Sequence, residues 1–167
     1  MATVTQTLLA EDAQFLATLF PQPLKTNGTE FPVYGLAFDA AADETAFWKW
    51  IADNYGSGNL TVGIFWYADT ASSGDVIWDV GLAAITPDTD TQDIETKAFT
   101  TVNSVTDTHL GTTGQRLHLA IVTVSNLDSL AAGDYVMLKL NRDANNAADT
   151  LTGDAIVTAI RVAYSDT

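Results

Sequence analysis

The sequence contains no cysteine, and only seven Lys and Arg residues stand against 21 Asp and Glu residues in its 167 positions. The absence of cysteine excludes disulfide frameworks, cysteine-based zinc sites and thiol nucleophiles. The formal net charge of −14 disfavours nucleic-acid binding, because phosphate backbones are bound by clustered Lys and Arg. The same charge disfavours anionic membrane surfaces. We therefore expect neither a nucleic-acid partner nor a membrane.

Long hydrophobic runs and prolines are also scarce. No apolar run reaches the roughly 18–20 residues that a membrane-spanning helix needs. The first twenty residues lack the basic start and apolar core of a secretion signal, which predicts synthesis in a cytoplasm. Three of the four prolines lie within residues 20–32, which predicts an irregular connection there. Hydrophobic residues still make up 47% of the chain, so one domain can bury a sizeable core.

Short apolar or alternating runs recur along the chain, separated by clusters of Gly, Asn, Asp and Ser. Such runs, rich in β-branched and aromatic residues, are typical of strands. They occupy residues 33–38, 46–52, 60–68, 76–85, 117–124, 135–142 and 155–164. The run at 44–52 also fits a short helix, but its aromatic content favours a strand. We predict an all-β, single-domain antiparallel sandwich of about eight strands over residues 31–167, after an N-terminal arm over residues 1–30 that begins with a strand.

The alternation within the runs predicts which side chains face the core. Three inward sets follow from it: Leu60, Val62, Ile64 and Trp66; Val76, Trp78, Val80 and Leu82; and Val136, Leu138 and Leu140. Phe65 and Tyr67 lie on the opposite face of a strand whose inner face is already apolar. Two aromatic residues there indicate a covered outer face, either under the N-terminal segment or under a neighbouring subunit. We favour the subunit, so Phe65 and Tyr67 are the candidate oligomer interface.

No catalytic pattern is present in the sequence. It contains no G-x-S-x-G elbow, no P-loop, no H-E-x-x-H and no dinucleotide-binding glycine pattern. The two histidines, His109 and His118, are interpreted as ordinary surface or half-buried residues rather than metal ligands. Asp75 and Asp79 share a strand face about 13 Å apart, too wide for a glycosidase pair. We predict that the protein is not an enzyme and requires no cofactor.

The stretch "LKLNRDANNAADTLTGDA", residues 138–155, raises the question of calcium. Against the EF-hand template it supplies Asp143, Asn145, Asp149 and Asp154, but it has alanine where an oxygen ligand and an obligatory glycine are required. A looser calcium loop remains open here and in "TPDTDTQDIE", residues 86–95. The favoured interpretation is structural: Arg142 faces inward by the strand phase, and Asp143 or Asp149 supplies the carboxylate partner that a buried cation needs.

Several turns and hairpins resemble those of small jelly-roll virion proteins of tailed phages. The likeness is carried by the hairpin with Trp66, "SGDV" at residues 73–76 and Trp78, by the turn "LAAGD", and by "RDANNAADTLTGDA" before a closing strand that ends at Tyr164. It covers residues 44–164 and leaves the first 40 residues outside.

The resemblance implies a jelly-roll sandwich that forms a homo-oligomer, commonly a trimer, on a virion. The implied function is that of a capsid decoration protein that binds the major capsid protein or another virion protein and stabilises the head shell. The N-terminal arm would then reach a neighbouring subunit, and residues 1–30 would be dispensable for the fold. The alternative is a carbohydrate- or receptor-binding sandwich of a phage fibre or tail, which surface aromatic residues and a loop calcium would suit.

Overall fold

The computed structural model describes residues 2–166 as ten strands and one short 3-10 turn. The strands are β1 (Thr3–Leu9), β2 (Gln22–Asn27), β3 (Pro32–Phe38), β4 (Glu44–Ile51), β5 (Leu60–Ala68), β6 (Asp75–Ile85), β7 (Asn103–Thr108), β8 (His118–Val124), β9 (Tyr135–Arg142) and β10 (Ala155–Ser165). The turn η1 (Ala10–Asp12) follows β1. No helix of residues 2–166 is long and apolar enough to cross a membrane.

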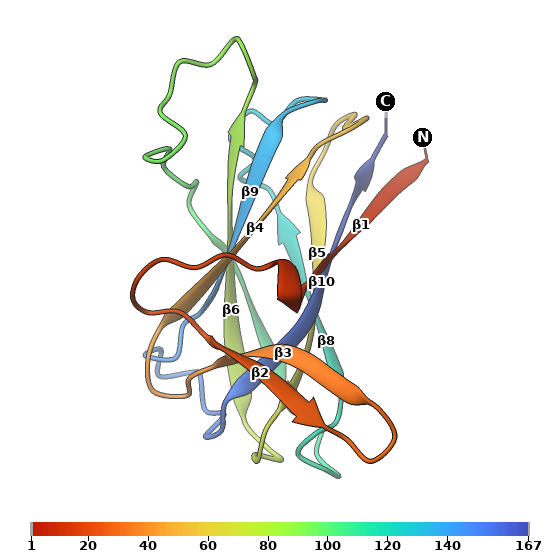
Figure 1. Cartoon of the computed structure of the whole chain (residues 1–167), viewed down its shortest axis with the longest axis vertical. Helices are drawn as coiled ribbons and strands as arrows, with labels where there is room; N and C mark the ends of the chain where they lie inside the picture. Colours follow the sequence, from red (N-terminus) through yellow and green to blue (C-terminus); the bar gives the residue numbers. More distant parts are fainter. Residues whose placement is uncertain (1, 167) are drawn as a thin grey trace.

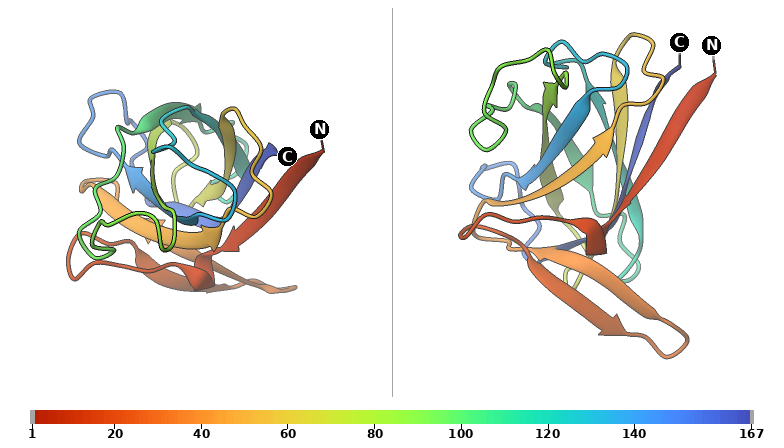
Figure 2. Two further views of the ribbon diagram at one scale, coloured as in Figure 1. Left: turned by 90° about the horizontal axis from the view of Figure 1, so that it is seen from above. Right: turned by 45° about the horizontal axis from the view of Figure 1, so that its top comes forward.

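The strands form two antiparallel sheets that pack face to face (Figure 1). The six-stranded sheet has the order β2-β3-β10-β5-β8, and β1 pairs with β10 beyond the end of β3. The four-stranded sheet has the order β4-β9-β6-β7. The β2–β3 hairpin projects from the sandwich, and both chain ends lie together at the opposite end of the molecule (Figure 2). This is the predicted β-sandwich of jelly-roll type, with ten strands instead of about eight.

The predicted inward sets form the core. All eleven side chains are fully buried between the sheets, together with Trp48 from β4 and Phe38 from β3. The Trp78 ring meets the Phe38 ring edge-on at 5.2 Å and the Trp66 ring at 6.3 Å, arrangements that aromatic pairs favour. Alternation with a period of two therefore identified the core correctly, and residues 44–51 are a strand.

Two strands lie outside the runs that were predicted as strands. β2 falls inside the stretch that the prolines indicated as an irregular connection, and β7 lies in a polar stretch rich in Thr, Asn and Ser. Both are edge strands. Pro23 is tolerated in β2 because an edge strand leaves half of its backbone donors outside the ladder.

Arg142 ends β9 with its side chain fully buried. Its guanidinium contacts Asp149 twice, with Nη2 to Oδ1 at 2.8 Å and Nε to Oδ2 at 3.1 Å. The remaining donors bind the backbone oxygens of Phe38, Leu151 and Gly153 at 2.7–3.1 Å. The residue beside it, Asp143, accepts instead from the side chain of Asn146 at 2.8 Å. Of the two predicted carboxylate partners, the structure therefore places Asp149 against the arginine.

Candidate functional site

The β2–β3 hairpin forms one edge of the six-stranded sheet and borders a cleft that also contains residues of β5 and β10. The chain turns back at Gly28, where a side chain is not possible because a Cβ atom would lie 2.5 Å from the Phe31 carbonyl oxygen. The turn places Phe31 at the hairpin tip with 68% of its surface exposed. We call the resulting space the hairpin cleft. Its volume is about 500 Å³, and it is lined by Thr26, Gly28, Thr29, Glu30, Phe31, Val33, Tyr67, Gln115, Leu117 and Thr158.

The hairpin cleft combines apolar walls with a few polar groups. Phe31, Val33, Tyr67 and Leu117 supply apolar surface, while amide, hydroxyl and carboxyl groups come from the other lining residues. Glu30 is the one charged side chain among the ten described lining residues. Binding sites for small organic ligands have this composition, with apolar and aromatic surface for affinity and a few polar groups for orientation.

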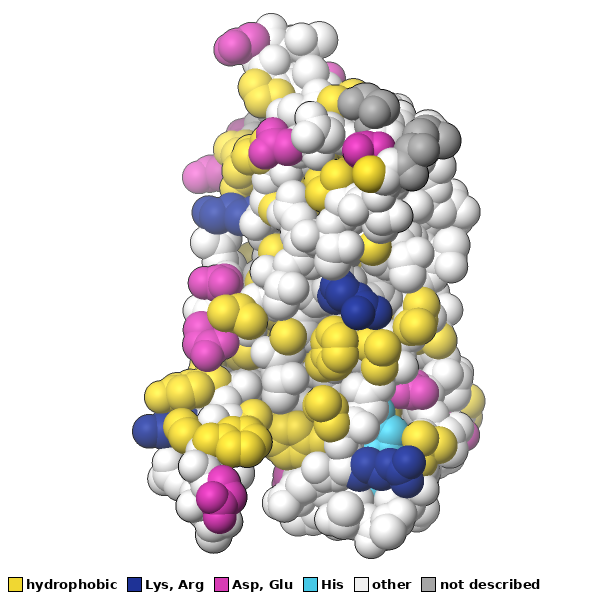
Figure 3. Space-filling view, turned by 90° about the vertical axis from the view of Figure 1, so that its right-hand side faces the viewer, with side chains coloured by type: hydrophobic (Ala, Val, Ile, Leu, Met, Phe, Trp, Pro, Cys, Tyr) yellow, Lys and Arg dark blue, Asp and Glu magenta, His cyan; other side chains and the backbone are white. Residues whose placement is uncertain are grey.

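The two aromatic residues of the predicted interface have different surroundings. Tyr67 is only 7% exposed, and its hydroxyl lies 3.2 Å from Thr26 Oγ1, so β2 of the N-terminal segment covers it. Phe65 is half-buried under the guanidinium of Arg161, which lies 5.6 Å from the ring centre. Leu119 is opposite Phe65 in the neighbouring strand β8 and is exposed, as is Ile121. Hydrophobic side chains gather on this face, and the molecule is hollowed at its lower end (Figure 3).

Residues 109–117, which we call the wall loop, connect β7 to β8 and carry Gln115 and Leu117 into the hairpin cleft. His109 is the first residue of the wall loop, and His118 is the first residue of β8 after it. Both are only 5% exposed, so the interpretation of the histidines as surface or half-buried residues was wrong. Their rings are 4.5 Å apart, and the His118 ring stacks on Trp66 at 4.6 Å. The indole of Trp66 donates to Asp107 at 2.7 Å.

Each imidazole accepts a backbone hydrogen bond from the wall loop. Leu110 N–H donates to His118 Nε2, and Gly111 N–H donates to His109 Nδ1, both at 3.0 Å. Because these nitrogens act as acceptors, the neutral rings carry their protons on His118 Nδ1 and His109 Nε2. His109 Nε2 donates to the Gly114 carbonyl at 3.0 Å, whereas His118 Nδ1 is buried without a partner among residues 2–166.

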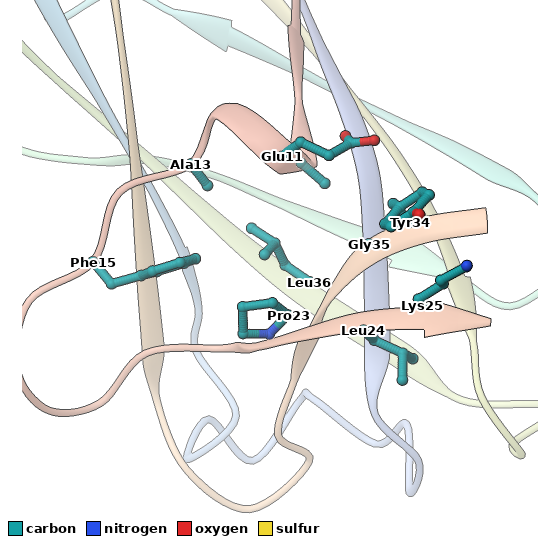
Figure 4. A pocket seen from close by; sticks show the side chains of 10 residues that line it. Glu11, Ala13, Phe15, Pro23, Leu24, Lys25, Tyr34, Gly35 and Leu36 are labelled. Carbon is teal, nitrogen blue, oxygen red and sulfur yellow. The ribbon is translucent and has the colours of Figure 1, made fainter. Parts of the chain in front are cut away.

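A smaller hollow of about 250 Å³ lies on the other side of the hairpin (Figure 4). Its walls come from the arm, through Ala13 and Phe15, and from the hairpin, through Pro23, Tyr34 and Leu36. Lys25 lies over the Tyr34 ring at 5.6 Å. The hollow is the seam along which the arm meets the hairpin, and Glu11 and Lys25 are its charged side chains.

The acidic loops that suggested calcium have other contacts. Asp149 is used by Arg142 and also accepts from Ile77 N–H at 3.1 Å. Burial raises the pKa of Asp154, and the nearby carboxylates of Asp69 and Asp39 raise it further. In the loop at residues 86–95, Asp90 accepts from the Thr86 backbone and Asp93 from the Glu95 backbone. Within residues 2–166, no group of three or more His, Cys, Asp or Glu side chains is arranged to hold a metal ion.

Solved structures match the protein over nearly its whole length. The CBM36-1 domain of a multidomain xylanase from the hindgut metagenome of Trinervitermes trinervoides is 8% identical, with a TM-score of 0.54 over 98% of this chain and 100% of that chain. The CBM35 of Abf62 from Cellvibrio japonicus is 13% identical, with a TM-score of 0.49 over 98% and 99% of the two chains. No protein-family model matches the sequence, and the comparison with curated proteins gave no match either.

At these identities the likeness shows the fold alone. This likeness does not test the virion resemblance of the sequence, which stays a prediction. The protein has the two-sheet β-sandwich fold that is also found in a carbohydrate-binding module.

Proposed function

We propose that the protein is a non-catalytic carbohydrate-binding β-sandwich, with the saccharide in the hairpin cleft. The observation that carries the proposal is the exposed ring of Phe31 at the mouth of the hairpin cleft, facing a space lined by Thr26, Gln115 and Thr158. A sugar ring offers C–H groups to an aromatic face and hydroxyl groups to amide and hydroxyl side chains. The hairpin cleft offers both kinds of contact.

The charge of the protein narrows the class of saccharide. The net charge is −14, and Glu30 is the one charged residue that we find among the described lining residues of the hairpin cleft. Anionic glycans would meet repulsion both at the cleft and over the surface. We therefore infer a neutral saccharide, or one with amino groups, as the ligand. The fold likeness to a module of a xylanase adds support and makes neutral xylo-oligosaccharides the first probes.

The first prediction concerns Phe31. Phe31→Ala should weaken binding of a neutral oligosaccharide about tenfold, because an aromatic contact contributes roughly 0.5–1.5 kcal/mol beyond the area that it buries. The fold should be unaffected, since the ring is mostly exposed. The measurement is calorimetric titration after a screen of neutral, amino and acidic glycans.

The matched control is Leu16→Ala, which removes an equally exposed apolar side chain from the arm, away from the hairpin cleft. It should bind as the wild type does. Equal binding by both variants and the wild type would place the saccharide elsewhere. A screen in which no glycan binds at neutral pH would overturn the proposed function.

A second role, as a homo-oligomeric decoration protein on a virion, stays a prediction from the sequence resemblance. One observation favours an oligomer: β8 is an edge strand with no proline, lysine or carboxylate, and it exposes Leu119 and Ile121. Such an edge is normally protected or paired. Incubation with expanded phage capsids tests this role, because a decoration protein binds them stoichiometrically and a saccharide-binding protein does not.

A further inference from the structure

We propose that His109 and His118 form an acid-sensitive latch on the wall loop, so that acidification releases the loop and the saccharide with it. The proposal rests on the proposed function, because it concerns the regulation of the hairpin cleft. Its starting point is that both imidazoles are buried, lie in mutual contact and accept backbone hydrogen bonds from the wall loop.

The latch holds only while both rings are neutral. Protonation of His118 converts Nε2 from an acceptor into a donor, and the N–H of Leu110 then faces another N–H. Protonation of His109 has the same effect on the N–H of Gly111. Either event sets a backbone N–H against an imidazole N–H beside a buried ring, which favours the open loop, where water can solvate both donors.

The groups packed around the pair also disfavour a charged His118. Burial is the largest cause of its lowered pKa, and the charges of the His109 ring and of the Arg116 guanidinium lower it further, whereas the backbone of Arg116 raises it. Asp107 of β7 acts in the opposite direction, but its carboxylate is engaged by the indole of Trp66. The loop after β5 contributes Asp69, whose carboxylate accepts from Thr70. A proton on His118 is therefore accommodated poorly while the loop is closed.

The wall loop connects this chemistry to the hairpin cleft. Gln115 and Leu117 line the cleft, and the residues on either side of them, Gly114 and His118, take part in the latch. Gly114 is packed so closely that a Cβ atom would lie 3.0 Å from the Ala71 carbonyl oxygen. When the two acceptor bonds are lost, the segment that carries the polar Gln115 and the apolar Leu117 loses its fixed position.

The direction of the pH effect follows from the neutral state of the latch. An imidazole that is more readily protonated in the open loop than in the closed one shifts the equilibrium toward the open loop as the pH falls. The change begins near the ordinary histidine pKa of 6.5 and grows below it, whereas above pH 7 the closed loop is favoured.

The experiment has two arms on the full chain. In the first, without ligand, amide exchange of Leu110 and Gly111 is followed by ¹⁵N NMR between pH 7.5 and 5.0 and corrected for intrinsic exchange. Both amides should lose protection on acidification, while amides at the centre of β5 keep theirs. In the second, the oligosaccharide found at pH 7.5 is titrated over the same range, and its affinity should fall about tenfold, since only the closed fraction binds.

His118→Gln provides the matched variant, because the glutamine oxygen can accept from Leu110 N–H and does not titrate in this range. Its affinity for the oligosaccharide should fall less than that of the wild type between pH 7.5 and 5.0, because only the bond from Gly111 to His109 can still be lost by protonation. If this variant does not fold, amide exchange in the wild type still tests the proposal. Amides of Leu110 and Gly111 that stay protected from exchange at pH 5.0 overturn the latch. A folded His118→Gln with the wild-type pH profile overturns it too.

The two proposals fail in different ways. The absence of any saccharide binding at pH 7.5 would overturn the proposed function and, with it, the gating of a saccharide, whatever the amides show. Binding that is present at pH 7.5 and unchanged at pH 5.0 would leave the proposed function intact and overturn only the latch.

Discussion

The guanidinium of Arg142 is fully buried, yet each of its five N–H groups has an oxygen to donate to. A buried charge is tolerated only when it is paired and its donors are satisfied. Asp149 supplies the opposite charge, and three backbone carbonyls supply the other acceptors. The loop after β9 is therefore shaped by the requirements of one side chain.

Replacing Asp149 should destabilise the protein severely. In Asp149→Asn the arginine stays buried without its counter-charge, and the free energy of unfolding should fall by about 3–5 kcal/mol. Urea unfolding followed by tryptophan fluorescence measures the change. Asp143→Asn is the control, because Asp143 contacts Asn146 instead of the arginine, and it should change stability little. A large loss in the control with none in Asp149→Asn would contradict the assignment.

The sequence alone predicts part of this buried ion pair. The strand phase predicts that Arg142 faces inward, and burial of a cation requires a carboxylate, so a nearby aspartate is expected. Strand phase cannot choose between Asp143 and Asp149, because the choice depends on how the intervening loop folds back. The histidines illustrate the same limit. His109 and His118 are nine positions apart, and their rings come into contact because the loop from β7 to β8 folds back between the two sheets' ends.

β1 is a fully paired strand of the six-stranded sheet, although the sequence predicted it as part of an N-terminal arm. It pairs with β10 along its whole length, from Thr3 opposite Ser165 to Leu9 opposite Ala159. Trp48 of the other sheet donates to the Leu9 carbonyl at 2.8 Å. Removing residues 1–30 would strip both β1 and β2 from the six-stranded sheet and expose core side chains, so we now expect the sandwich to lose stability without them.

Two neighbouring leucines of β1 test its contribution. Leu8→Ala should lower the free energy of unfolding by about 2–4 kcal/mol, because Leu8 is 8% exposed and packs in the core. Leu9 lies on the other face of the strand and is 46% exposed, so Leu9→Ala should cost about 0.5 kcal/mol or less. Thermal unfolding of both variants measures the difference. Equal, small effects would show that β1 is dispensable.

The elements that the sequence missed have a common physical property. β2 is exposed along most of its length and β7 alternates exposed with half-buried residues, so neither has the fully buried side chains that produce a clear period of two. The hairpin cleft was missed for the same reason, since its principal wall is formed by β2, β3 and the turn between them. Phe31 follows that turn, and the sequence alone gives no sign that a sheet lies opposite its ring.

For the whole molecule, the outer face of the six-stranded sheet is the main unexplained surface. The chain carries a net charge of −14, yet β8 presents a row of uncharged residues with Leu119 and Ile121 outward. Phe65 and Tyr67, the predicted oligomer interface, lie on this face. β2 covers Tyr67, which leaves Phe65, Leu119 and Ile121 as the part available to a second copy.

A charge placed on this face tests the oligomer. If copies associate through it, Ile121→Lys should shift the protein from a trimer or another oligomer to a monomer, because a buried lysine without a partner opposes association. Sedimentation velocity at micromolar concentrations measures the state. Ile94→Lys places the same charge at an equally exposed isoleucine outside this face and should leave the oligomer intact. A wild-type protein that sediments as a monomer would contradict the prediction.

β10 is the central strand of the larger sheet, with β5 on one side and β1 and β3 in succession on the other. Among the strands of this sheet it is also the last to leave the ribosome. During synthesis, β1, β3 and β5 are made before β10, the strand with which all three pair. About 150 further residues must be synthesised after β1 before it can pair with β10. The six-stranded sheet therefore closes only after residues 155–165 have been synthesised, and a transcript truncated before residue 155 would encode a product in which the sheet lacks its centre.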